Sequence, residues 1–256
     1  MSAVRENLVV KFGGTSLGTP ARIRRAARRV ASLVASGRCV VAVVSAMGHT
    51  TDHILETLGA LETSRGGGPA GREVDRALAT GEDLSAAFLA AALNAIGVPA
   101  RSLRGGEAGV RAGGEFGAAW VERVDARCLR SLLARGIVPV VSGFQGERAD
   151  RETATLGRGG SDTSAVAIAA ALGAAPCHIV TDVDAVYDRD PRRHADARPL
   201  HRLSHDELLD LSRSGALVVA SEAASLARAH GVPLRVLGWD APPRDEESGT
   251  FVGGVP

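Results

Sequence analysis

The stretch LVVKFGGTS, Leu8–Ser16, contains the features that decide the fold. A short apolar run ends in Lys11, the only lysine of the chain, and two glycines follow it. A strand that ends in a compact cation and a glycine turn is typical of an anion site at the carboxyl end of a parallel strand. The other cationic side chains are arginines, whose planar fork does not replace an ammonium group in a tight site. The alternative is a strand-end lysine that reaches solvent.

Apolar runs that predict strands alternate along the chain with segments of helical periodicity. The predicted strands are Leu8–Lys11, Val40–Ser45, Val138–Ser142, Cys177–Thr181, Leu234–Leu237 and a last short strand at Thr250–Val252. The predicted helices are Ala21–Val34, Asp83–Ala95, Val124–Ala134, Thr163–Leu172, Ser204–Ser214 and Ser221–Ala229. This alternation predicts βαβ units, and therefore an α/β fold with a mostly parallel sheet covered by helices on both faces.

Composition excludes several classes of function. A formal net charge of +1 over 256 residues argues against a nucleic-acid binder or a membrane-surface binder. The longest apolar stretch, Ala165–Ala175, is too short to span a bilayer, and no signal peptide is visible at the amino terminus. The three isolated cysteines, Cys39, Cys128 and Cys177, lack zinc-site spacing and favour a reduced, cytoplasmic location.

Two common nucleotide-binding motifs are absent from the chain, namely GxxxxGK[ST] and a GxGxxG that follows a strand. Small and hydroxyl residues instead follow several predicted strands, where ligands of open α/β sheets bind. These segments are Lys11–Ser16, Ser45–Asp52, Gly143–Gly146 and Thr181–Asp184, together with Leu156–Thr163, which leads directly into a predicted helix.

Five sequence blocks then connect these segments to a known family. They are VKFGGTS at Val10–Ser16, VVSAMGHTTD at Val43–Asp52, TGEDLSA at Thr80–Ala86, TLGRGGSD at Thr155–Asp162 and TDVDAVYDRDPR at Thr181–Arg192. With these blocks in order, nearly the whole chain resembles the aspartate kinases of the amino acid kinase family. The resemblance implies an αβα sandwich and one kinase domain, with a substrate lobe at about residues 1–150 and a nucleotide lobe at about 151–256. It also implies that ATP phosphorylates the side-chain carboxylate of L-aspartate to 4-phospho-L-aspartate.

The resemblance assigns roles to individual residues. The catalytic pair is Lys11 and Asp162, and the substrate-binding residues are Ser45, Thr51, Glu82, Arg158 and Ser161. The nucleotide-binding residues are Lys11, Gly13, Gly14, Thr181, Asp182, Tyr187 and Arg192. Mg²⁺ is expected on phosphate oxygens and water, so no metal site made of protein side chains is assigned. A carboxylate nucleophile is already ionised at neutral pH, so positioning and charge stabilisation carry the chemistry.

Four of these residues have a simpler role that the sequence alone leaves open. Asp162 could cap a helix that begins at Thr163, because aspartate is preferred at that position. Glu82 could be a first-turn acid of a helix that begins at Asp83, and Ser45 a cap at a strand end. Tyr187, the only tyrosine, could pack over a loop.

The chain departs from the family pattern in three places. Leu217 stands where aspartate kinases usually have a lysine that meets nucleotide phosphates, so ATP binding is weakened unless an arginine (Arg192, Arg193 or Arg213) replaces the charge. No ACT regulatory domain follows Thr250–Val252, which predicts an enzyme without ACT-mediated feedback control. The Gly-rich insert Ser64–Gly71 is short.

Two other functions stay open beside aspartate phosphorylation. One is a kinase for a related amino-acid carboxylate. The other is a catalytically poor subunit that binds nucleotide or amino acid and partners another protein, an interpretation that Leu217 favours. The resemblance also allows a homodimer through the kinase domain.

Overall fold

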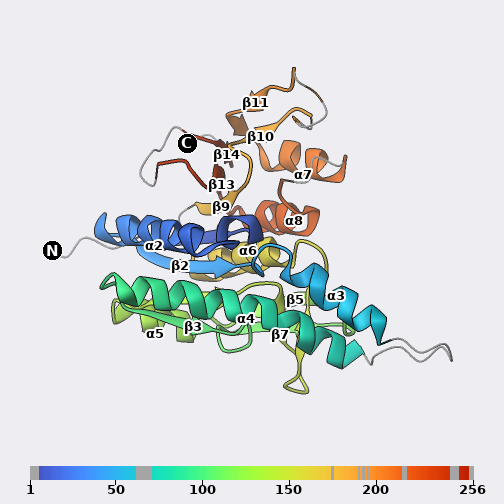
Figure 1. Ribbon diagram of the computed structural model, residues 1–256. Coiled ribbons are helices and arrows are strands. Elements are labelled where there is room, and N and C mark those ends of the chain that lie inside the picture. Colours follow the sequence, from blue (N-terminus) through green and yellow to red (C-terminus); the bar gives the residue numbers. More distant parts are fainter. Residues whose placement is uncertain are drawn as a thin grey trace.

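A computed structural model describes residues 6–61, 71–173, 176–189, 191, 194, 196–214, 218–242 and 248–253 (Figure 1). In these residues eight strands form one sheet in the order β12-β14-β13-β9-β1-β2-β6-β3. Their bounds are β1 Asn7–Phe12, β2 Cys39–Val44, β3 Ala100–Leu103, β6 Val138–Ser142, β9 Cys177–Thr181, β12 Arg202–Leu203, β13 Leu234–Gly238 and β14 Thr250–Val252. All neighbouring pairs are parallel except β13 and β14. The predicted strands and the α/β fold class are confirmed.

The sheet lies at the centre of the protein, and side chains on both of its faces are buried. Along β1, Val9 belongs to one apolar cluster, whereas Leu8 and Val10 belong to another on the opposite face. β2 repeats this alternation, with Val41 in the first cluster and Ala42 in the second. Period-two alternation of apolar residues toward both faces is the mark of a sheet covered by helices on each side.

Two groups of helices cover the sheet. Side chains of α2 (Pro20–Ala35) and α4 (Gly71–Ala95) pack in one cluster. Those of α5 (Arg127–Ala134), α6 (Gly160–Leu172), α7 (His205–Arg213) and α8 (Ser221–His230) pack in the other. In Figure 1, α7 and α8 lie in the upper right of the view, and α4 and α5 lie in its lower half. None of the described helices combines the length and the apolar character needed to cross a bilayer.

Smaller elements were not predicted from sequence. The short helices α1 (Gly14–Leu17) and α3 (Thr50–Ala60) follow β1 and β2. A four-stranded sheet has the order β5-β4-β7-β8, and a two-stranded sheet pairs β10 with β11. The bounds of these strands are β4 Val110–Gly113, β5 Trp120–Val124, β7 Gln145–Glu147, β8 Thr153–Thr155, β10 Val186–Tyr187 and β11 Pro199–Leu200.

Three predicted helix starts are wrong. α4 begins at Gly71 rather than Asp83, so Glu82 lies in the middle of a helix and is not a first-turn acid. α6 begins at Gly160 and is preceded by Gly159, which leaves Asp162 in the first turn instead of at the cap. α5 begins at Arg127, because Val124 ends strand β5.

Several sequence interpretations fall on positions outside the described residues. They concern Arg192, Arg193, Leu217 and all of the Gly-rich insert except Gly71. The roles inferred for these residues therefore stay predictions.

Candidate active site

A cavity of about 560 Å³ opens where β1 and β2 end. It is lined by Lys11 on β1, by Ser45 just after β2, and by residues of α3, α4 and α6. The seven residues predicted to be catalytic or substrate-binding all line it: Lys11, Ser45, Thr51, Glu82, Arg158, Ser161 and Asp162. Thr51 lies in the first turn of α3. The carboxyl ends of parallel strands thus bring together residues that are far apart in sequence.

Lys11 and Asp162 form an ion pair at the wall of the cavity. Lys11 Nζ lies 2.7 Å from Asp162 Oδ1, and the two side chains are only 11% and 10% exposed. Asp162 Oδ2 also accepts a hydrogen bond from the Ala220 N–H at 3.4 Å. A carboxylate in the first turn of α6 is favoured by the helix dipole. The pair therefore holds one ammonium group at a defined place beside the cavity.

Glu82 presents a buried carboxylate to the same cavity. Its Oε1 accepts a hydrogen bond from the Ala46 N–H at 2.8 Å. Its Oε2 is buried and has no hydrogen-bond partner among the described residues. Burial raises the pKa of Glu82 from 4.5 to about 7, although the Ala46 N–H and the charge of Lys11 act in the opposite direction. A buried acceptor without a partner is costly, so this oxygen is suited to a cationic donor on a ligand.

Two glycines let the backbone close around these groups. A Cβ at Gly14 would stand 2.5 Å from the Ala46 carbonyl oxygen, and one at Gly81 would stand 2.8 Å from the Ala46 Cβ. Gly81 lies inside α4, directly before Glu82. The close approach of α4 to the end of β2 is what allows Glu82 to reach the Ala46 N–H.

Arg158 lies in the turn between β8 and α6. It is exposed, and no hydrogen bond or ion pair engages its guanidinium in the described part of the chain. The turn has little room: Gly159 has φ 77°, and a Cβ on it would stand 2.2 Å from the Ala220 Cβ. A side chain at position 159 would therefore push the turn away from α8. Arg158 is left with all its donors available to an anion in the cavity.

Apart from Lys11, the described residues predicted to bind nucleotide are absent from the lining of this cavity. Gly13 and Gly14 follow β1, and the Gly13 N–H donates to the Val180 carbonyl at 3.0 Å, so that amide already has a protein partner. Thr181 ends the neighbouring strand β9 and donates to Asp182 at 3.1 Å. On β10, the Tyr187 hydroxyl donates to Asp184 at 2.8 Å, which raises the pKa of the tyrosine.

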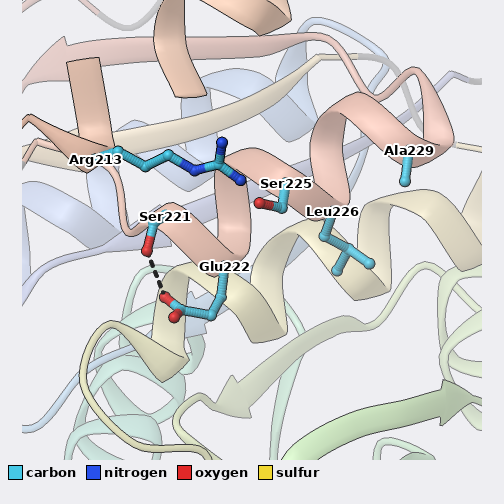
Figure 2. Close-up of a pocket in the computed structure, with 6 residues that line it drawn as sticks. All are labelled: Arg213, Ser221, Glu222, Ser225, Leu226 and Ala229. Carbon is cyan, nitrogen blue, oxygen red and sulfur yellow. Dashed lines mark hydrogen bonds between the residues drawn. The ribbon is translucent and has the colours of Figure 1, made fainter. Parts of the chain in front are cut away.

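A second cavity, of about 600 Å³, lies along α7 and α8 (Figure 2). It is lined by Arg213, Ser221, Glu222, Ser225, Leu226 and Ala229. The Ser221 hydroxyl donates to the Glu222 carboxylate at 3.1 Å, as Figure 2 shows. Among the described residues predicted from sequence, its lining includes Arg213, one of the three arginines considered as a replacement for the missing lysine.

Sequence reasoning missed several residues of the main cavity. On α4, Asp75 and Leu78 line it together with Glu82, at positions i, i+3 and i+7 of one helix face. This spacing would have identified them if the helix had been extended back to Gly71. Phe144 also lines the cavity and has φ 65°, a conformation with no signal in the local sequence.

The fold and this cavity define a class: an α/β protein with a cavity, lined by charged and hydroxyl side chains, at the carboxyl ends of parallel strands, where open α/β sheets bind their ligands. The sequence matches the amino acid kinase family over residues 6–238, and the chain belongs to that family.

Several aspartokinases are similar to the chain. The aspartokinase of Geobacillus stearothermophilus is 44% identical over 229 residues, which cover 90% of this chain and 55% of the relative. Aspartokinase 2 of Bacillus subtilis is 43% identical, with coverage of 90% and 55%. The chain spans about half the length of these curated relatives.

Solved structures show the same fold. Aspartate kinase from Synechocystis has a TM-score of 0.83 and 40% identity, and the match covers 98% of this chain and 40% of that one. UMP kinase from Bacillus anthracis shares the fold alone, with a TM-score of 0.65, 17% identity and coverage of 97% and 96%.

Proposed function

We propose that this chain transfers the γ-phosphoryl group of ATP to the side-chain carboxylate of L-aspartate. A carboxylate oxygen attacks the γ-phosphorus, the bond from that phosphorus to the bridging oxygen of ADP breaks, and 4-phospho-L-aspartate and ADP leave. The similarity to aspartokinases supports this reaction, and so do the charged and hydroxyl side chains that line the cavity. The aspartate carboxylate is ionised before it reacts, so no general base has to remove a proton.

One observation carries the proposal: a single cavity holds complementary groups for each charged part of the substrate. The guanidinium of Arg158 suits the α-carboxylate, since its planar fork binds carboxylates at two points. Glu82 Oε2, which accepts no hydrogen bond within the described part of the chain, suits the α-ammonium group. Ser45 and Thr51 supply hydroxyl donors for the side-chain carboxylate, and Ser161 supplies another for substrate. Lys11 then stabilises charge on the transferring phosphoryl group, and Asp162 orients Lys11.

The assignment of nucleotide and metal is part of the same proposal. ATP phosphates would lie near Gly13, Gly14 and Thr181, because β1 and β9 are neighbours and end side by side. Asp182, Tyr187 and Arg192 would complete the nucleotide site. Mg²⁺ would neutralise phosphate charge, bound mainly by phosphate oxygens and water. In the described part of the chain, no three His, Cys, Asp or Glu side chains form a metal-binding group.

The division into two lobes near residue 150 is also a proposal. Both parts contribute residues to the main cavity: Glu82 comes from the first, whereas Arg158 and Asp162 come from the second.

A homodimer through this domain is a further proposal. It is supported by Leu84, Phe88 and Ile96 along the outside of α4 and just beyond its end, which are 47%, 44% and 49% exposed. Analytical ultracentrifugation of the parent and Phe88→Glu tests it, since a charge on this face should yield monomer.

Trapping of the product with hydroxylamine tests the function directly. With L-aspartate, ATP and Mg²⁺, the chain should form aspartyl hydroxamate, because hydroxylamine reacts with an acyl phosphate. D-aspartate and L-glutamate serve as matched controls and should give at least tenfold less. Faster turnover of glutamate would instead favour the related-carboxylate kinase. Binding of ATP or aspartate without hydroxamate would favour the binding-subunit alternative.

Substitution of Leu217 by lysine tests how the nucleotide site obtains its charge. A charge-assisted hydrogen bond contributes about 1.5–3 kcal/mol, so a missing cation would weaken ATP binding by about ten- to a hundredfold. We expect an arginine to supply this charge, and the Kd for ATP should therefore change less than about threefold in Leu217→Lys. Calorimetric titration measures it, with aspartate as the control ligand. ATP binding more than tenfold tighter in the variant would contradict compensation.

A further inference from the structure

Asp75 is a fully buried carboxylate on the cavity-facing side of α4. It is 0% exposed and accepts three hydrogen bonds. Two come from Thr155, from its N–H at 2.8 Å and its hydroxyl at 2.8 Å, and the third comes from the Gly117 N–H at 3.0 Å. Burial of a carboxylate is expensive and aspartate is rarely fully buried, so such a group points to a specific structural task.

The partners of Asp75 show what it holds. Thr155 ends β8, three residues before Arg158, and its carbonyl accepts the Ala119 N–H at 3.2 Å. The far end of the same segment is held by Asp162, which pairs with Lys11. The turn that carries Arg158 is therefore fixed between two carboxylates, Asp75 before it and Asp162 after it.

Asp75 also lies on the same helix as Glu82. They are seven positions apart, which is about 10.5 Å along a helix axis at 1.5 Å per residue, and both line the cavity. Because α4 is a continuous helix from Gly71 to Ala95, the bonds from Asp75 to Thr155 set the Arg158 turn at a fixed place relative to Glu82. The ligand groups for the α-carboxylate and for the α-amine are thereby placed relative to each other.

We propose that Asp75 is a positioning residue, which fixes the Arg158 turn against Glu82 and so sets the length of amino acid that the site accepts. This inference rests on the proposed function for its substrate, but the bonds themselves do not. All three partners of Asp75 are donors. An asparagine keeps the shape but removes the charge and one of the two acceptor oxygens. Its bonds to the two N–H groups are then either lost or weakened from charge-assisted to neutral, and the Thr155 hydroxyl keeps a bond to the NH₂ group only if it turns from donor to acceptor.

The test compares Asp75→Asn with Asp83→Asn in the full chain. Asp83 is the matched control, a carboxylate of α4 that accepts from Ser142 Oγ at 2.8 Å and from Gln145 Nε2 at 3.1 Å, outside the cavity lining. Asp75→Asn should raise the KM for aspartate at least tenfold, change the KM for ATP less than twofold and reduce the preference for aspartate over glutamate. At pH 8.5, where Glu82 is ionised with or without the neighbouring charge of Asp83, Asp83→Asn should leave both KM values within twofold of the parent.

Hydrogen exchange in the free protein provides a readout that does not depend on activity. The Thr155 and Gly117 amides should exchange at least tenfold faster in Asp75→Asn and at the parental rate in Asp83→Asn. Unchanged exchange of these amides, or faster exchange with an unchanged aspartate KM, overturns the inference. A parent that phosphorylates no acidic amino acid refutes the proposed function instead, while the exchange result still decides whether Asp75 holds the turn.

A milder variant covers the case in which Asp75→Asn does not fold. Thr155→Val removes only the hydroxyl donor and keeps the carboxylate and both N–H bonds. It should raise the aspartate KM about threefold with an unchanged KM for ATP. An aspartate KM equal to that of the parent would overturn the positioning role.

Discussion

Lys11→Ala should lower kcat by a factor on the order of 10²–10³, the usual effect of losing one preorganised transition-state donor. The ammonium group lies in a nearly buried pair with Asp162, where charge interactions are weakly screened. Lys11→Arg should also fail, because a planar fork does not fit where a point charge is held by one carboxylate. Steady-state rates at saturating ATP and aspartate measure both effects. Activity near the parental level in either variant would show that Lys11 is structural.

Loss of activity must be separated from loss of fold in this experiment. Removing one partner of a buried pair leaves the other charge uncompensated, at a cost of about 3–5 kcal/mol. The double variant Lys11→Ala/Asp162→Asn removes both charges and should recover most of the thermal stability lost in Lys11→Ala. Its kcat should stay low, since the ammonium group is still missing. A double variant that recovered kcat would contradict a catalytic role for Lys11.

Glu82→Gln should raise the KM for aspartate about ten- to a hundredfold, because the amide loses a charge-assisted hydrogen bond worth about 1.5–3 kcal/mol. The parent should also show a pH dependence that the variant lacks. Burial raises the pKa of Glu82 to about 7, so the carboxylate becomes ionised between pH 6 and 8. The aspartate KM of the parent should therefore fall as pH rises through 7 and then level off. A parental KM that does not vary over this range would contradict the pairing with the substrate amine.

The same shift has a consequence for stability, with a definite sign. The folded state holds the Glu82 proton more tightly than the unfolded state, whose pKa is near 4.5. The stabilising contribution of this proton is complete below pH 4.5 and is lost as pH rises to about 7. Denaturant unfolding of the parent and Glu82→Gln across this window measures the loss, which should be absent in the variant.

Long regular elements could be predicted from the sequence because their apolar pattern is strong. The core strands β1, β2, β6, β9 and β13 are short runs of branched apolar residues, and both faces of the sheet are buried. The strands of the small sheet are three to five residues long and rich in Gly and polar residues, so local pattern did not reveal them. Their pairing depends on contacts distant in sequence.

Residues of the candidate site could likewise be predicted only where the local sequence carried a signal. Lys11, Glu82, Arg158 and Asp162 could be found from motifs, but Asp75 could not, because the predicted helix began too late. Gly81 stands two residues before the predicted start at Asp83, and glycine is unfavourable in helix interiors. α4 nevertheless continues through Gly81, where the neighbouring Ala46 occupies the place of a side chain. Tertiary packing thus overrode local propensity at the residue beside Glu82.

This glycine also matters to attempts to raise the thermal stability of the protein. Replacement of a mid-helix glycine by alanine is a standard route to higher melting temperature, with a gain of up to about 1 kcal/mol where the new methyl group has space. At Gly81 the methyl group would stand 2.8 Å from the Ala46 Cβ and would push α4 away from the strand end. Helix-stabilising designs should therefore leave this position untouched and use exposed positions such as Gly59 in α3, where a Cβ meets nothing within 4 Å.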